Sequence, residues 1–243
     1  MRSSPRRRVL VGIVLAVWGA ARRAPAADLP ALLRAVERNA TFAVPATADI
    51  RIEMPGAPTA ASALRLAGRG HVVRLEAAGG WRALVKASKI VVAAADRPPR
   101  ATAEAALPGS ALLVADFAPF TATMLRVPLI SDDGPLGVVV TGEPRPPSPY
   151  VLVVYTIDHE RSVVTAAKHY RWEISNLVQM TRVRAWDTVG THLRPKVIDV
   201  QETVGGKTTT LSFTWRVQPD LAAALFLPSG LRSPLPASPD AAP

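Results

Sequence analysis

Histidines, carboxylates and cysteines are the side chains that most often bind metals or carry out catalysis. The histidines of this sequence are His71, His159, His169 and His192, and no two of them stand at a metal-ligand spacing or beside a cluster of carboxylates. The sequence contains no cysteine, so it has no thiolate ligand, no cysteine nucleophile and no disulfide. A nucleophile elbow, a phosphate loop and a dinucleotide fingerprint are also absent. The residues therefore predict no catalytic site, no metal and no cofactor.

Aromatic residues are the positive signal. Trp81, Trp172, Trp186 and Trp215 lie on predicted strands, whereas Phe117 and Phe120 lie in a segment between strands. These side chains could fill an ordinary core. In a strongly curved sheet they could instead line a cavity, because small barrels either fill their interior with side chains or hold one ligand. The residues alone leave both interpretations open.

The elements that would position these aromatics are mostly strands. Apolar residues at helical spacing, with Asp28 as a cap, predict one helix over residues 29–39. Beyond it the period becomes two, which predicts strands at 42–54 (interrupted by Pro45), 62–68, 71–77, 81–86, 89–95, 137–143, 150–158, 162–172, 180–189, 193–204 and 207–217.

Three local patterns complete the prediction. Arg97-Pro98-Pro99 is expected to break the strand series, and residues 110–125 to form one or two short helices across the domain. In the last strand Leu211, Phe213, Trp215 and Val217 alternate with polar residues, which indicates one buried face. The fold class is therefore mainly β with a few helices, built on one long, strongly curved antiparallel sheet.

The first residues have the order of a signal peptide. Four arginines precede an apolar run from Val9 to Ala21, and the small residues Ala24 and Ala26 follow. This run of 13 residues is shorter than the roughly 18 that a membrane span needs, although an uncleaved anchor helix is the alternative. We expect a signal peptide at 1–26, a single domain at 27–231 and a disordered tail at 232–243.

Removal of the signal peptide changes the charge of the chain. Residues 1–26 hold six of the 29 basic residues and none of the 19 acidic residues, so the mature chain carries a net charge of +4. A mild charge without a basic cluster argues against nucleic acid as a partner. The signal peptide, together with the absence of a cysteine that could carry a lipid, predicts an exported, soluble protein.

The chain resembles the outer-membrane lipoprotein-sorting proteins, whose fold is similar to that of the periplasmic lipoprotein carrier LolA. The resemblance covers roughly residues 40–231 and rests on the order of several short motifs. These motifs are Pro108-Gly109-Ser110, Asp116-Phe117, the strand Tyr150–Asp158, Thr191–Val200, Lys207–Phe213, Pro219-Asp220-Leu221 and Leu225-Phe226-Leu227-Pro228. Two features of the family lack a clear counterpart: its Trp-x-Asp pair and the arginine that latches the lid of the carrier.

This resemblance implies an incomplete β-barrel whose open side is covered by helices around a hydrophobic cavity. Such proteins are carriers rather than enzymes, bind acyl chains of lipids or lipoproteins in the periplasm, and exchange them with an inner-membrane exporter and an outer-membrane acceptor. We accordingly expect an acyl chain to bind between the sheet and the 110–125 segment. The candidate ligand-binding residues are Phe117, Phe120, Met124, Trp186, Leu211, Phe213 and Trp215.

Two alternatives remain from the sequence. The same fold could serve an envelope sensor or structural binding protein with no transport role, which predicts a filled barrel and an exposed apolar patch. An exported hydrolase would instead show clustered polar residues with shifted pKa values in a cleft.

Overall fold

The computed structural model describes residues 28–54, 62–87, 89–94, 97–102, 104–107, 112–134 and 137–236. The predicted signal peptide and residues 237–243 of the predicted tail lie outside these ranges. The described strands are β1 (Phe42–Glu53), β2 (Ser62–Gly70), β3 (Val72–Ala77), β4 (Arg82–Lys86), β5 (Lys89–Ala94), β6 (Arg97–Ala101), β7 (Leu125–Gly134), β8 (Gly137–Pro144), β9 (Leu152–Asp158), β10 (Val163–Tyr170), β11 (Leu177–Val189), β12 (His192–Glu202) and β13 (Thr208–Val217). The helices are α2 (Asp28–Ala40) and the 3₁₀ turns η1 (Ala78–Gly80), η2 (Val114–Phe117), η3 (Ala223–Phe226) and η4 (Pro228–Arg232).

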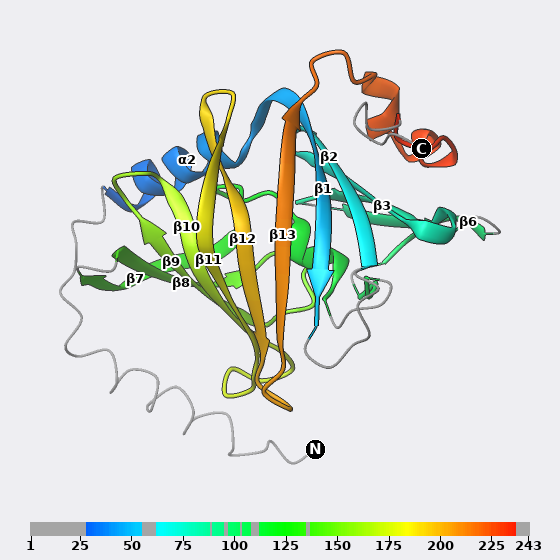
Figure 1. Ribbon diagram of the computed structural model, residues 1–243. Helices are drawn as coiled ribbons and strands as arrows, with labels where there is room; N and C mark the ends of the chain where they lie inside the picture. The colour runs from blue at the N-terminus through cyan, green and yellow to red at the C-terminus, as the bar shows by residue number, and fades with distance from the viewer. Residues whose placement is uncertain are drawn as a thin grey trace, which may run out of the picture.

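All thirteen strands form a single antiparallel sheet in the order β6-β5-β4-β3-β2-β1-β13-β12-β11-β10-β9-β8-β7. The two halves of the chain join where β1 pairs with β13, from Ala46 opposite Val217 to Glu53 opposite Thr210. The edge strands β6 and β7 do not pair with each other, so the curved sheet stays open rather than closing into a barrel. Figure 1 shows this long sheet, with α2 across one part of it. The mainly β fold predicted from the sequence is confirmed.

Helix α2 confirms the helix expected at 29–39, and it covers part of the concave face of the sheet. Its apolar residues Leu33 and Val36 are almost fully buried against a cluster that includes Val153 on β9 and Phe120. The backbone N–H of Ala122 donates to Glu37 on α2 at 3.2 Å, which ties the helix to the segment that follows η2. We call α2 together with residues 112–124 the cover.

The helices predicted for residues 110–125 are mostly wrong. Only η2, a single turn, is helical among the described residues of this segment. Pro119 follows the turn and has no N–H with which to extend it. From Leu125 onward the chain pairs with β8 as strand β7 instead. The cover is therefore one helix and an irregular strap rather than a set of helices.

The C-terminal segment packs on the outer face of the sheet, opposite the cover. Phe226, Leu231 and Leu235 are almost fully buried there against residues of β2, β4 and β5 such as Leu84. Figure 1 shows this segment beside β2 and β3. The disordered tail expected from residue 232 is thus wrong for residues 232–236, because Leu235 is 3% exposed.

Proline positions explain two departures from the predicted strands. Pro45 does not interrupt β1, because it falls in an irregularity of the β1–β2 register between Phe42 and Ala46, where the ladder needs no donor. Arg97-Pro98-Pro99 does not end the series but lies in β6, an edge strand whose residues are all exposed.

At the end of β13, Val217 is 46% exposed, so the predicted buried face stops at Trp215.

Candidate functional site

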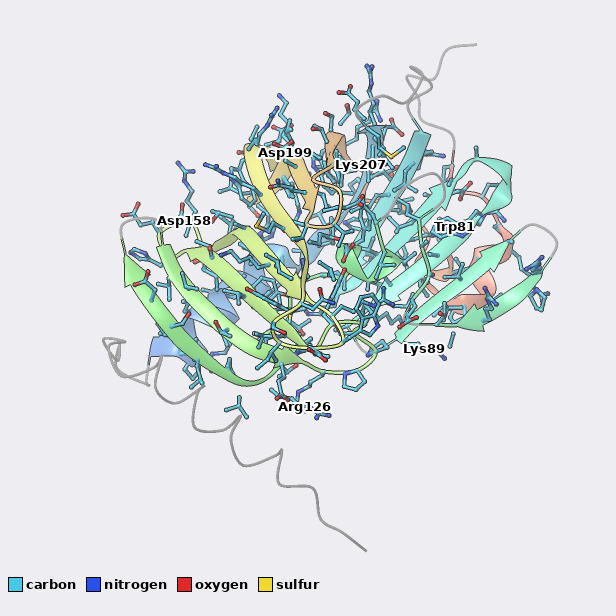
Figure 2. All side chains as sticks on the ribbon, turned by 90° about the horizontal axis from the view of Figure 1, so that it is seen from below. Trp81, Lys89, Arg126, Asp158, Asp199 and Lys207 are labelled. Atoms are coloured by element: carbon cyan, nitrogen blue, oxygen red, sulfur yellow. The ribbon has the colours of Figure 1, made fainter. Side chains whose placement is uncertain are left out.

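A cavity of about 340 Å³ lies between the concave face of the sheet and the cover. Its wall includes Val36 of α2, the η2 region around Phe117, and strand residues from both halves of the sheet such as Leu66 and Val153. In Figure 2, seen from below, the strands curve around an interior crowded with side chains. The volume falls within the range of about 300–1,000 Å³ that is usual for ligand pockets.

All seven residues singled out from the sequence lie in the wall of this cavity. Strand β13 contributes Leu211, Phe213 and Trp215, as its alternation predicted. The Phe213 and Trp215 rings stack with centroids 5.7 Å apart and planes 5° from parallel. The Trp215 indole N–H donates to the backbone oxygen of Pro195 at 2.8 Å, so its one polar atom is satisfied and its ring is left for packing. Trp186 of β11 lies on the same wall.

The cover contributes the other three predicted residues. Phe120 is almost fully buried and packs edge-on against Tyr155 of β9, with ring centroids 5.5 Å apart. The Tyr155 hydroxyl lies 3.9 Å from the sulfur of Met124, a soft contact that a flexible thioether accommodates. Phe117 is half-buried beside the apolar cluster of β1 to β5 and β13. The structure thus brings the predicted sheet and strap residues to one apolar cavity.

Among the polar residues of the cavity wall that were not predicted as site residues, we single out four: Asp116, Tyr150, His169 and Gln179. The Tyr150 hydroxyl donates to Asp116 Oδ1 at 2.5 Å, and Gln179 Nε2 donates to Asp116 Oδ2 at 3.4 Å. The ring of His169 packs on that of Tyr150, with centroids 4.5 Å apart. We call these four residues the polar cluster.

The polar cluster is assembled from four separate segments, which is why a sequence scan misses it. Asp116 comes from η2, Tyr150 precedes β9, and His169 and Gln179 are register partners on β10 and β11. The sequence placed His169 as an isolated strand histidine, and only the pairing of β10 with β11 gives it neighbours. The available signals were the pair Asp116-Phe117 and Tyr150, both among the motifs of the family resemblance.

Burial dominates the electrostatics of this region. Burial, followed by the charge of Asp116 and, for Tyr150, its hydrogen bond to Asp116, raises the pKa of Tyr150 and of Tyr155 well above the ordinary value for tyrosine. Burial also lowers the pKa of His169, and the nearby Asp116 offsets this only in part. At neutral pH the imidazole of His169 is therefore uncharged and both tyrosines are protonated.

Arg194 on β12 is a buried cation at another part of the cavity wall. It is 6% exposed and donates to the backbone oxygens of Asn39 at 2.5 Å and Thr41 at 2.7 Å, at the end of α2. Its guanidinium also lies 4.4 Å from the ring centre of Phe42. Burial lowers the pKa of Arg194 to about 10, so the group stays charged at neutral pH. Arg194 therefore caps the carboxyl end of α2 and links it to the sheet.

No group of three or more histidine, aspartate or glutamate side chains among the described residues is arranged to hold a metal ion. No helix among them is both long and apolar enough to cross a membrane.

Comparison with known proteins places this architecture among solved structures. The sequence matches no family model and no curated protein. A domain described as an outer membrane lipoprotein-sorting protein, from Vibrio parahaemolyticus, superimposes with a TM-score of 0.68 at 14% identity, covering 84% of this chain and 97% of that one.

Two further structures agree with the first. A DUF1329 family protein from Desulfovibrio piger gives a TM-score of 0.66 at 13% identity and covers 84% of this chain and 96% of its own. A LolA superfamily protein from Nitrosomonas europaea gives 0.63 at 15% identity, with 81% and 96% covered. The chain therefore has a LolA-like fold.

Proposed function

We propose that this protein is a periplasmic carrier that binds the acyl chains of lipids or lipoproteins in its cavity and contributes to outer-membrane lipoprotein sorting. The observation that carries the proposal is the cavity of about 340 Å³ between the sheet and the cover, with Phe117, Phe213 and Trp215 in its wall. The similar structures described as lipoprotein-sorting and LolA superfamily proteins support it. An export signal at residues 1–26 would deliver the chain to that compartment.

The energetics of an apolar cavity suit an acyl chain. Each methylene removed from water contributes about 0.8 kcal/mol, so eight buried methylenes would contribute roughly 6 kcal/mol before the cost of ordering the chain. The cavity needs no catalytic group for this role, and the proposal is that the protein acts as a carrier and not as an enzyme. An exporter that delivers the cargo and an acceptor that receives it are the partners the proposal requires.

Binding of a fluorescent acyl ester with an uncharged head group tests the proposal. We expect saturable binding by the wild type and a loss of at least tenfold in affinity for Phe117→Asp and Phe213→Asp, because a carboxylate in the apolar wall must be desolvated when the chain enters. Val217→Asp is the matched control, since Val217 lies on the same strand as Phe213 but outside the cavity wall and is 46% exposed.

Circular dichroism would first establish that each variant is folded. Native mass spectrometry of the purified wild type would show whether a lipid is retained. Absence of saturable binding by the wild type, or equal binding by the folded Phe117→Asp, Phe213→Asp and Val217→Asp variants, would refute the carrier proposal. It would favour a binding protein of the same fold with a filled interior.

A further inference from the structure

The polar cluster is an unusual feature for the wall of an apolar cavity, because buried polar groups normally satisfy one another. Asp116 is satisfied: it accepts bonds from Tyr150 at 2.5 Å, from Gln179 at 3.4 Å and from the backbone N–H of Leu113 at 3.0 Å. His169 and Gln179 are not. They are 8% and 6% exposed, which makes any unused hydrogen-bonding capacity costly in the empty protein.

The unused capacity can be counted. A neutral imidazole has one donor and one acceptor, yet Nδ1 of His169 is buried and has no partner among the described residues. The Gln179 amide has two N–H donors and one carbonyl oxygen, and the bond to Asp116 uses one donor. Gln179 therefore retains a donor and an acceptor, and His169 Nδ1 an unpaired position, at the wall of the cavity.

The charge of the cluster decides what kind of group it can receive. Asp116 is negative, and its charge already disfavours ionisation of Tyr150 and Tyr155. Arg171 is the cation whose charge bears on the pKa of Tyr150, and it pairs with Glu104 at 2.9 Å. Lys86, Arg145 and Arg194 also line the cavity, but they are not among the charges that shift the pKa of Tyr150, Tyr155 or His169. An anionic head group beside Asp116 would consequently meet the repulsion of its carboxylate, whereas an uncharged group would meet hydrogen-bonding partners.

We infer that the polar cluster is the head-group subsite of the cavity, and that it selects amphiphiles with an uncharged hydroxyl or amide over those with a carboxylate or phosphate. This inference rests on the proposed function, because the subsite has a ligand only if the apolar part of the cavity holds an acyl chain. Hydroxyl and amide groups both donate and accept, which matches the mixed capacity of His169 and Gln179.

Competition for a neutral fluorescent probe would measure this selectivity. The competitors share a twelve-carbon chain and differ only in the head: dodecanol, dodecanamide, dodecanoate and dodecylamine, at pH 8. We expect dodecanol and dodecanamide to displace the probe most effectively. Preference for a neutral head over an ionised one can also arise from desolvation alone, so the variants below carry the test.

Asp116→Asn removes the charge at nearly constant shape, and we expect it to raise the affinity for dodecanoate relative to dodecanol by roughly tenfold. Gln179→Leu removes the hydrogen-bonding partner, and we expect it to weaken dodecanol binding by roughly 3- to 10-fold. Thr181→Val is the matched control, since Thr181 lies two residues further along β11 and also lines the cavity.

The outcomes separate the inference from the proposed function. An unchanged ratio of dodecanoate to dodecanol affinity in folded Asp116→Asn would overturn the inference. So would equal effects of Gln179→Leu and Thr181→Val on dodecanol, or tighter binding of dodecanoate than of dodecanol by the wild type. Failure of every twelve-carbon compound to bind the wild type would count against the carrier proposal itself.

Discussion

Arg74 on β3 holds the C-terminal segment against the outer face of the sheet, and its removal should destabilise the protein strongly. The side chain is 0% exposed. It donates to the backbone oxygens of Leu225 at 3.1 Å, Gly230 at 2.9 Å and Ser233, and to the carboxylate of Glu76 at 3.2 Å. Burial lowers the pKa of Arg74, which reflects the cost of desolvation that these acceptors offset.

The expected magnitude follows from the partners that Arg74→Met would leave behind. Removing one partner of a buried ion pair lowers the free energy of unfolding by about 3–5 kcal/mol. Glu76 keeps its ion pair with Arg82 at 3.4 Å and its bond from the N–H of Leu235 at 2.8 Å, so no carboxylate is left bare. The loss should therefore fall near the lower end, about 3 kcal/mol. For a domain of this size it corresponds to a fall in Tm of about 6–12 °C.

Urea unfolding followed by tryptophan fluorescence would measure this loss. Arg69→Met is the matched control: Arg69 also donates to a backbone oxygen of the C-terminal segment, that of Leu221 at 2.7 Å, but its side chain is exposed. Loss of this bond, which is only partly buried, should cost about 1 kcal/mol. If Arg74→Met destabilises the protein no more than Arg69→Met does, the argument that burial makes this bond network strong is refuted.

Two further predictions concern pH and backbone space. Burial lowers the pKa of His169 in the folded protein below the unfolded value of about 6.5. Between these two pKa values the unfolded chain binds more protons than the folded protein. The free energy of unfolding should therefore fall as the pH drops below 6.5, by at most about 1.4 kcal/mol per pH unit. Between pH 7.5 and 5.5 the urea midpoint should change less with pH for His169→Phe than for His192→Phe, since His192 is the less buried histidine. Equal slopes of midpoint against pH in the two variants would contradict this prediction. Gly137→Ala should cost about 3 kcal/mol, because at φ +116° a Cβ would lie 2.4 Å from the Ile157 backbone oxygen. Gly79→Ala, at φ +74° with open space around it, should cost only about 1 kcal/mol, and thermal unfolding of the two variants would distinguish the effects.

The sequence predicts well those elements whose periodicity is set by one buried face. Helix α2 and strand β13 both bury one stripe or face, so Leu33 and Val36, or Leu211 and Phe213, recur at the expected spacing. The cavity residues of β13 could be proposed for the same reason, because alternation on that strand identifies its inward-facing apolar side chains. That alternation contains no information on the polar cluster, which depends on which strands become neighbours.

The C-terminal segment shows why composition can mislead. Its proline, alanine and serine residues have no helical or strand period, which is typical of disorder. Its order comes from elsewhere: Arg65, Arg74 and Arg82 donate to its backbone oxygens, and each lies about 150 residues or more earlier in the chain. A backbone oxygen can accept a hydrogen bond whatever side chain its residue carries. The residue types of the C-terminal segment therefore do not indicate these hydrogen bonds.

The cover is joined to the sheet in a different way from the strands to each other. The thirteen strands share one continuous ladder of backbone hydrogen bonds, whereas the described polar bonds that fasten the cover are few and mostly involve side chains, such as those of Asp116, Asn39 and Arg194. Detaching the cover would break these bonds and its apolar packing but leave the ladder intact. Motion of this kind belongs to the microsecond-to-second range of local opening, while loss of the ladder requires global unfolding. If the cavity holds a ligand as proposed, this architecture would separate the lifetime of the bound molecule from the lifetime of the fold, so that the ligand could exchange often in a protein that rarely unfolds.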